Sequence, residues 1–304
     1  MISKKLIDYI SNKKNISKRD LIEKDLLLHQ ILLHLSKNKN FKEKYAFKGG
    51  TCLIKAYFNY YRFSEDLDFT FINQDLFKNK SKKQIRKIIS QELDLIINLL
   101  NNFHKDLKFK PDKSNQDFFE FGAGNIFTTI KVYYTSIETK KESFIKLQFN
   151  FMEKLFYPIK IMKLNSIIYD MNMEELEFIF PDEVDKYKGI YLKNYDLNEI
   201  SLEKIRAVLT RKGFKARDFI DLYKITNGNI NKLKKLEKKI IEKTKFSLIH
   251  EKYEENIKEK INIQLYQLGD EENLLINPLK KDFHYFIKDL EKYIQKIIKK
   301  NIIH

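Results

Sequence analysis

The stretch from residue 45 to residue 72 constrains the fold more than any other part of this chain. Residues 45–48 are a short apolar run, and Gly49-Gly50-Thr51 separates this run from a segment with helical spacing. Residues 66–71, Asp-Leu-Asp-Phe-Thr-Phe, then alternate polar and apolar side chains. Such alternation is typical of a strand with one buried face. The pattern therefore predicts a strand, a glycine turn, a helix and a second strand in immediate succession.

The second of these strands carries two carboxylates on one face. Because side chains alternate along a strand, Asp66 and Asp68 project from the same side, and the apolar residues project into the core. Two such carboxylates can hold Mg²⁺, which activates an attacking hydroxyl and stabilises a leaving pyrophosphate. Gly49, Gly50 and Thr51, at the start of a helix, offer backbone N–H groups and a hydroxyl to phosphates. Each motif alone is usually an ordinary turn or an exposed acidic pair; together they predict a magnesium–triphosphate site.

The rest of the chain divides into a mixed part and a helical part. Helices are expected at 21–35 and 81–103, and strands at 118–121, 126–134 and 144–152. From about residue 200 the pattern is helical, with helices expected at 201–211, 216–224, 230–244, 257–268 and 281–300. We therefore expect an α+β domain over residues 1–195 and a helical domain over residues 196–304.

Composition favours a cytoplasmic protein with a polyanionic partner. The net charge is +16, from 58 Lys+Arg against 42 Asp+Glu. Such a balance favours RNA or DNA, although lysine is abundant throughout and much of it can be simple solvated surface. The single cysteine excludes an internal disulfide framework. No signal peptide and no apolar run of membrane-spanning length is evident.

Several blocks resemble the AbiEii/AbiGii toxin family of nucleotidyltransferases, the toxins of type IV toxin–antitoxin systems. The resemblance spans roughly residues 20 to 225. The matching blocks are Glu23-Lys24-Asp25, Phe47-Lys48-Gly49-Gly50-Thr51-Cys52-Leu53, Arg62-Phe63-Ser64-Glu65-Asp66-Leu67-Asp68-Phe69, Leu202-Glu203-Lys204-Ile205-Arg206-Ala207 and Ala216-Arg217-Asp218-Phe219-Ile220-Asp221-Leu222-Tyr223.

This resemblance implies a polymerase-β-like nucleotidyltransferase core with a mixed sheet. It also implies a nucleoside triphosphate and Mg²⁺ as cofactors, a structured RNA as acceptor, often the tRNA 3′ end, and a cognate antitoxin encoded nearby. The helical half would supply Lys204 and Asp218 to the catalytic site. Arg62 and Ser64 lie within the family block, and we assign them with the glycine turn to nucleotide binding.

The residues around Lys204 support this assignment but leave an alternative open. A stripe of leucine and isoleucine leaves Lys204 and Arg211 on another face of their helix, while Asp218 and Asp221 share a face of the next. A lysine oriented by an aspartate neutralises the charge of a triphosphate. The alternative is a structural lysine–aspartate network between packed helices.

One position departs from the usual third metal-binding carboxylate of this fold. In the strand expected at 144–152, the polar-face position that would carry it is Gln148. An amide oxygen can bind Mg²⁺ without contributing charge, so the second metal should be held weakly. Glu153 is the nearest acid, and it has the wrong parity unless the strand ends or bulges.

Three functions therefore stay open from the sequence. The first is transfer of a nucleotide to RNA, at the tRNA 3′ end, with growth arrest as the outcome. The second keeps the site but modifies a protein hydroxyl, for which Ser64 is a candidate acceptor. The third is a non-enzymatic, basic nucleic-acid-binding protein in which the aspartates are structural.

Overall fold

The structure, a computed structural model, describes residues 2–103, 107–248, 251–260 and 269–299. It divides into two compact units. The first comprises Met1–Glu153 and Ile159–Asn194, and the second Lys154–Pro158 and Tyr195–His304. The segment Lys154–Pro158 thus belongs to the helical unit although it lies in the middle of the first unit's sequence. Each unit is described separately below.

The first unit is built on a mixed sheet. Within the described residues it has seven strands in the order β3-β4-β5-β2-β1-β7-β6. The strands are β1 (Tyr45–Lys48), β2 (Asp66–Phe71), β3 (Phe119–Gly122), β4 (Phe127–Thr135), β5 (Glu142–Asn150), β6 (Lys160–Leu164) and β7 (Ile190–Asn194). The central strand β2 runs antiparallel to β1 and parallel to β5, and β1 runs parallel to β7.

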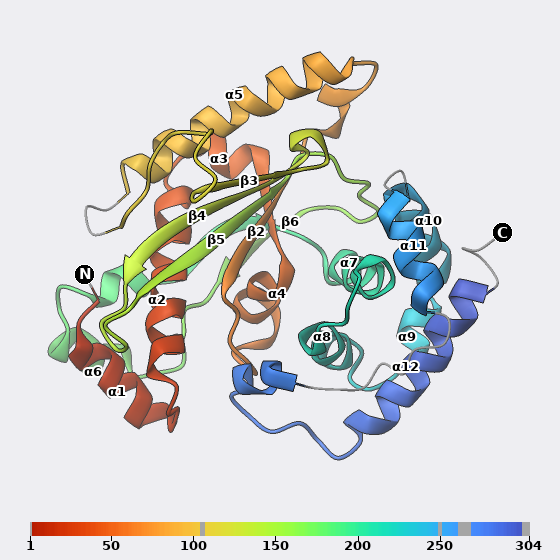
Figure 1. Ribbon diagram of the computed structural model, residues 1–304. Helices are drawn as coiled ribbons and strands as arrows, with labels where there is room; N and C mark the ends of the chain where they lie inside the picture. The colour runs from red at the N-terminus through yellow and green to blue at the C-terminus, as the bar shows by residue number, and fades with distance from the viewer. Residues whose placement is uncertain (1, 104–106, 249–250, 261–268, 300–304) are drawn as a thin grey trace. The chain divides into compact units, whose positions relative to one another are not determined.

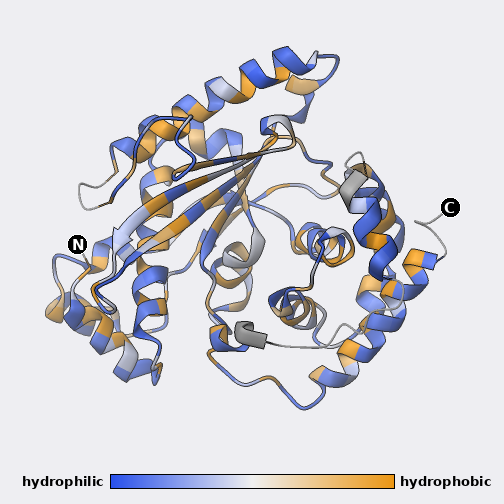
Figure 2. Ribbon diagram, in the orientation of Figure 1, coloured by the Kyte–Doolittle hydropathy of each residue, from blue (hydrophilic) through white to orange (hydrophobic). Residues whose placement is uncertain are grey.

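Aromatic side chains form the core against one face of this sheet. The rings of Phe69 and Phe149 stack at 5.3 Å, and Phe47 packs on Phe69 at the same distance. Phe41, in helix α3 (Lys39–Lys44), packs against Phe69. Figure 2 shows polar and apolar residues alternating along β4 and β5. The helices of this unit are α1 (Lys4–Lys14), α2 (Arg19–Ser36), α3 (Lys39–Lys44), α4 (Gly49–Cys52), α5 (Lys82–Asn101) and α6 (Met173–Ile179) (Figure 1).

The helix that follows the glycine turn has an unusual geometry. Only Gly49–Cys52 is α-helical, and Leu53–Phe58 continues as a π-helix. Such π-helical turns are frequent at functional sites. The helical spacing alone does not separate the two forms, because both bury one apolar face.

Strand β6, at one edge of the sheet, and its neighbour β7 were not predicted. Their sequences mix charged and apolar residues, and Ile161 and Tyr191 point outward with 69% and 56% of their surface exposed. Strand β7 is in the sheet because its last residue, Asn194, pairs with Phe47 of β1, far away in sequence. A pairing of this kind leaves no local pattern for sequence analysis to find.

The second unit is helical. Its helices are α7 (Leu197–Thr210), α8 (Ala216–Thr226), α9 (Asn231–Lys234), α10 (Glu237–Ser247), α11 (Glu251–Glu259) and α12 (Phe283–Ile297). The single helix expected at 230–244 is wrong, because the chain breaks into α9 and α10 there. Most of the helix expected at 257–268 lies outside the described residues.

A buried ion pair holds the segment Lys154–Pro158 in the second unit. The carboxylate of Glu199 accepts hydrogen bonds from the backbone N–H groups of Phe156 and Tyr157 and pairs with Lys243 at 2.7 Å. Lys243 also donates to the backbone carbonyl of Lys154.

The predicted class is confirmed, an α+β protein with a mixed sheet and helices in its C-terminal part. Among the described helices, none is long and apolar enough to cross a membrane.

Candidate active site

Asp66 and Asp68 lie on the polar face of β2. Both side chains are partly exposed, whereas Leu67 and Phe69 between and after them are buried in the core. The strand alternation predicted this arrangement. Partial exposure leaves carboxylate oxygens accessible to a ligand that approaches the polar face.

Cationic and amide side chains flank the two aspartates on the neighbouring strands. In the register of the sheet, Lys48 of β1 is opposite Asp68, and on β5 Lys146 is opposite Asp66 while Gln148 is opposite Asp68. Directly opposed residues have Cβ atoms about 5 Å apart. The fold therefore brings two lysines to positions beside the aspartates. Neither lysine could be placed there from the sequence, since only the strand order makes them neighbours of the aspartates.

Gly49 is required by its closeness to Asp68. Its φ is +75°, a conformation that residues with a side chain rarely adopt. A Cβ atom at this position would lie 2.1 Å from Oδ2 of Asp68. The carboxylate therefore packs directly against the backbone at the start of α4, and the predicted glycine turn and the predicted aspartate form one local structure.

Gly50, Thr51, Arg62 and Ser64 form the layer beneath this turn. A Cβ atom on Gly50 would lie 2.4 Å from a terminal nitrogen of Arg62, which is 1% exposed. Arg62 also donates to the carbonyl of Phe63. The hydroxyl of the buried Thr51 is 2.8 Å from that of Ser64 and also bonds to the carbonyl of Asp66. These contacts connect the glycine turn to the start of β2.

This burial changes the roles that follow from the sequence. The Thr51 hydroxyl is engaged inside the protein, and the Arg62 guanidinium is packed under Gly50. Both side chains thus connect the turn to β2 from the interior of the protein.

Gln148 and Glu153 occupy different environments near the end of β5. Gln148 is partly exposed beside Asp68, and its amide is 3.5 Å from the Thr129 hydroxyl. Glu153 is buried, accepts a hydrogen bond from Asn150 at 3.0 Å, and its backbone N–H donates to Gln74. Within the described part of the chain, no three acidic, histidine or cysteine side chains gather into a metal-binding group.

A buried triad holds the π-helix that follows the turn. Lys55 pairs with Asp25 at 2.8 Å, and the Tyr60 hydroxyl lies 2.7 Å from Lys55 and 2.9 Å from Asp25. Burial lowers the pKa of Lys55, and Asp25 opposes that shift. Asp25 belongs to one of the blocks with family resemblance, but its partner could not be identified from spacing, because 30 positions separate it from Lys55.

Glu23, from the same block, secures a turn of the chain. Its carboxylate accepts hydrogen bonds from the hydroxyl of Ser136 and the backbone N–H groups of Ile137 and Glu138. Glu23 is 2% exposed. Its role is therefore structural, at the turn between β4 and β5.

The helical unit brings together the lysine and aspartates that the sequence singled out. Lys204 of α7 lies 2.7 Å from both Asp218 and Asp221 of α8, and Arg211 also pairs with Asp218. Asp218 and Asp221 are buried, and Lys204 is 9% exposed. Burial raises the pKa of Asp218, but Lys204 and Arg211 outweigh that effect and the pKa is lowered. Asp218 is therefore an anion held between two cations.

Lys260 is a further cation beside this cluster that the sequence analysis missed. Its amino group donates to the carbonyl of Val208 and lies 4.5 Å from the ring of Phe214. Burial and the nearby Arg211 lower its pKa to about 8.

Comparisons with known proteins give a family and two distant structural relatives. The model of the family described as "Nucleotidyl transferase AbiEii toxin, Type IV TA system" matches residues 30–296. The crystal structure of JHP933 from Helicobacter pylori is 15% identical, with a TM-score of 0.43 over 93% of this chain and 95% of that one. A nucleotidyltransferase structure from H. pylori, titled as putative, is 17% identical, with a TM-score of 0.40 over 95% of this chain and 100% of that one. No curated protein matches.

The family match covers both the sheet with its two aspartates and the helices with Lys204 and Asp218. It also excludes the third function considered above, a nucleic-acid-binding protein without enzymatic activity. The chain belongs to the AbiEii family of nucleotidyltransferase toxins of type IV toxin–antitoxin systems.

Proposed function

We propose that this nucleotidyltransferase moves a nucleotide from a nucleoside triphosphate to RNA, at the 3′ end of tRNA, and that Mg²⁺ assists the transfer. The observation that carries the proposal is the contact between Asp68 and the backbone of Gly49. It places a partly exposed carboxylate beside the N-terminal end of a helix, where a metal and a phosphate chain would be bound next to each other.

The donor set fits one magnesium ion better than two. Asp66 and Asp68 supply carboxylate oxygens from one face, and Gln148 supplies an amide oxygen from the strand beside them. Magnesium prefers oxygen ligands and keeps positions for water and phosphate oxygens. When bound, it would neutralise charge on the triphosphate and on the leaving pyrophosphate. Because Gln148 is uncharged, a second metal ion would be bound more weakly.

The residues around the aspartates would bind and orient the triphosphate. The backbone N–H groups at Gly49 and Gly50 point from a helix end, which favours anions. Arg62 and Ser64 fix the shape of the turn from below. Lys48, opposite Asp68, adds positive charge on the same face of the sheet. The phosphates would thus be bound mainly by backbone N–H groups, with Lys48 beside them.

In this proposal, Lys204 and Asp218 act on the charge of the phosphates. Two aspartates fix the Lys204 ammonium at 2.7 Å each, so it is held in one orientation. A lysine fixed in this way neutralises developing phosphate charge without first having to be ordered. Asp218 and Asp221 would act as positioning residues for Lys204.

The RNA acceptor is supported by the charge of +16 and by the family's place among toxins. A toxin needs a cellular target, and a basic protein concentrates polyanions near its surface. Modification of tRNA 3′ ends would stop translation and growth. A cognate antitoxin would limit this activity in the cell, and the enzyme would act in the cytoplasm.

The test is transfer of label from each of the four nucleoside triphosphates to purified tRNA in the presence of Mg²⁺. Wild type should label the 3′ end with at least one triphosphate, and Asp68→Asn should not. The matched control is Asp75→Asn, which removes an exposed carboxylate of the same unit that pairs only with a neighbouring lysine. Label on the protein instead of on RNA, above all on Ser64, would replace the RNA acceptor by a protein hydroxyl.

A further inference from the structure

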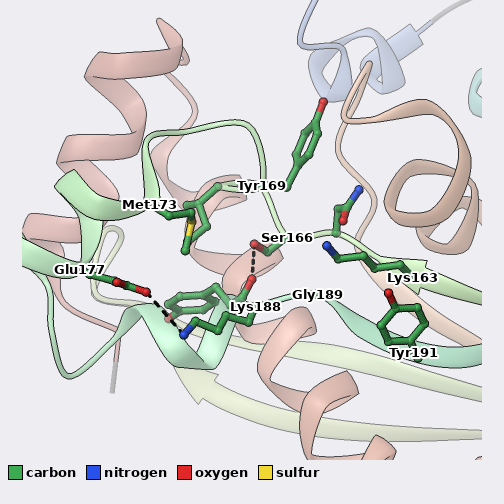
Figure 3. A pocket seen from close by; sticks show the side chains of 11 residues that line it. Lys163, Ser166, Tyr169, Met173, Glu177, Lys188, Gly189 and Tyr191 are labelled. Atoms are coloured by element: carbon green, nitrogen blue, oxygen red, sulfur yellow. Dashed lines mark hydrogen bonds and ion pairs between the residues drawn. The ribbon is translucent and has the colours of Figure 1, made fainter.

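A cavity that the proposed reaction does not use lies in the sheet unit at strands β6 and β7. It has a volume of about 710 Å³ and is lined by β6, β7, α6 and the segments that connect them. Figure 3 shows polar and aromatic side chains pointing into it. Met173 and Ile168 supply the apolar part of the lining.

Lys163 is the cationic group of this cavity with no internal partner. Among the described residues it makes no ion pair or hydrogen bond, although most lysines nearby do. Its aliphatic stem lies across Gly189, where a Cβ atom would be 2.1 Å from Cε of Lys163. The missing side chain at residue 189 therefore makes the space in which this lysine lies.

Tyr191 presents an aromatic ring beside Lys163. The two residues are directly opposite in the antiparallel pair of β6 and β7, so their side chains share one face. Tyr191 is 56% exposed. Its ring is available for stacking on the same face of the sheet as Lys163.

Tyr169 and Asn165 complete this part of the lining. The ring of Tyr169 is 37% exposed and stacks on Tyr60 at 6.4 Å, which holds it in place. Among the described residues, the side-chain amide of Asn165 has no hydrogen-bond partner, while its backbone N–H bonds to the π-helix at Lys55. An amide of this kind offers both a donor and an acceptor to the edge of a base.

The opposite wall of the cavity differs in its charge. In this wall, Lys188 lies 3.5 Å from Glu177, and it also pairs with Asp185 outside the lining at 2.6 Å, so its charge is already balanced by carboxylates. A phosphate is favoured only at the Lys163 end. The cavity thus distinguishes the two ends of a ligand, with the anionic end at Lys163 and a neutral or donor-bearing end toward α6.

We propose that this cavity binds one nucleotide of a single-stranded RNA, with the phosphate on Lys163 and the base against Tyr191 or Tyr169. Exposed aromatic rings interleaved with lysine are the usual means of binding unpaired nucleotides. The choice of RNA rather than a free nucleotide rests on the proposed function. An apolar protein partner would use the rings but would gain nothing from the lysine.

The position of the cavity suits an RNA that also reaches the aspartates. It opens at Gly189, and Asn194 at the other end of β7 pairs with Phe47, next to the glycine turn. A strand rises about 3.3 Å per residue, so these two ends are on the order of 17 Å apart. The cavity is therefore separate from the triphosphate site, but one extended RNA strand could reach both.

The test measures RNA binding without triphosphate, in full-length protein carrying Asp68→Asn, so that transfer is not required. The probe is a labelled, unstructured single-stranded RNA of about 12 nucleotides, within the length range that single-strand-binding folds cover. Tyr191→Ala should weaken binding by roughly tenfold through lost stacking. Lys163→Met, which keeps the length of the side chain, should weaken it and lower the salt dependence by about one ion.

Two variants control for changes outside the cavity, and a third changes the cavity without changing its charge. Lys5→Met removes an exposed lysine of α1, and Tyr285→Ala removes an exposed ring of the helical unit; neither should alter binding. Gly189→Ala keeps every charge but pushes the Lys163 stem out of its position. It should weaken RNA binding, which a simple count of charges does not predict.

A competition with adenosine monophosphate separates the two sources of a nucleotide. The proposal is supported if Lys163→Met and Tyr191→Ala each lose both RNA binding and the binding of adenosine monophosphate. If these variants lose the monophosphate but keep RNA, the cavity takes a free nucleotide and the RNA assignment is overturned. Wild-type affinity for both ligands in both variants overturns the nucleotide site altogether. Transfer activity is measured separately, so failure of the proposed function is not confused with either result.

Discussion

The carboxylates of the sheet unit and those of the helical unit differ in what surrounds them. Asp66 and Asp68 are partly exposed, with lysines opposite them on neighbouring strands. Asp218 and Asp221 are buried and lie 2.7 Å from Lys204. The first pair keeps oxygens accessible to a ligand, and the second is already neutralised by the protein. In the proposed function, the same residue type therefore binds the ligand in one unit and positions a lysine in the other.

The sharpest test of this difference is Asp68→Asn. Loss of a metal-binding charge should reduce transfer at least about a thousandfold, since a metal contributes several kcal/mol and 1.4 kcal/mol is tenfold. Because Asp68 is partly exposed, the free energy of unfolding should change by less than about 1 kcal/mol. Labelled-triphosphate assays and urea denaturation measure the two effects. A large loss of stability would show that Asp68 is structural.

Asp221→Asn should show the reverse pattern. It removes a buried charge from Lys204, and breaking a buried pair costs about 3 kcal/mol because the partner stays buried without compensation. The free energy of unfolding, measured with urea, should fall by that amount. The matched control is Glu254→Gln, which breaks an exposed pair with Lys258 of the same unit and should cost less than about 0.5 kcal/mol. Equal effects of the two variants would contradict the contrast.

Acid should destabilise the sheet unit before the helical unit. Burial, assisted by Lys55, lowers the pKa of His29 from 6.5 to about 3. The unfolded chain therefore binds a proton first as the pH falls below 6.5, and stability is lost in that direction, by about 2 kcal/mol between pH 7 and pH 5. The lowered pKa of Asp218 gives stability that is lost only below its unfolded value of 3.8.

Urea denaturation at a series of pH values tests this order. His29→Gln, which keeps a donor for the carbonyl of Lys188, should remove most of the pH dependence in this range. The same substitution at His34 serves as the comparison, since that residue lies on the same helix. An unchanged slope in His29→Gln would exclude His29 as its cause.

Gln148→Glu should give the smallest of these effects, a change in the affinity for Mg²⁺. Whether the affinity rises or falls shows whether the metal lies beside Gln148. It adds a third carboxylate opposite Asp68, which should tighten Mg²⁺ by about tenfold at a site of oxygen ligands. Lys146 and Lys48 lie close enough to limit the added repulsion. The readout is the magnesium concentration for half-maximal transfer, together with thermal stabilisation by Mg²⁺ alone. Weaker magnesium binding would place the metal away from Gln148.

Local sequence order was enough to predict the centre of the sheet unit. The alternation at residues 66–71 placed Asp66 and Asp68 on one face, and the glycine pair marked the turn beside them, because both depend only on neighbouring backbone geometry. The spacing on α7 and α8 put Lys204 with Arg211 on one face and Asp218 with Asp221 on another, whereas only the family resemblance brought Lys204 and Asp218 together. Strands β6 and β7 could not be found from local order, since they are defined by their partners.

Neighbouring residues thus decide the type of the central elements and the side of each on which its polar groups lie. That Lys48 flanks Asp68, that Asp25 neutralises Lys55, and that Gly189 makes room for Lys163 follows from contacts between distant segments. The two kinds of feature differ in the range of the interactions that set them. Side-chain direction follows from dihedral angles within a few residues, whereas burial and charge pairing arise between segments that only the folded chain brings together.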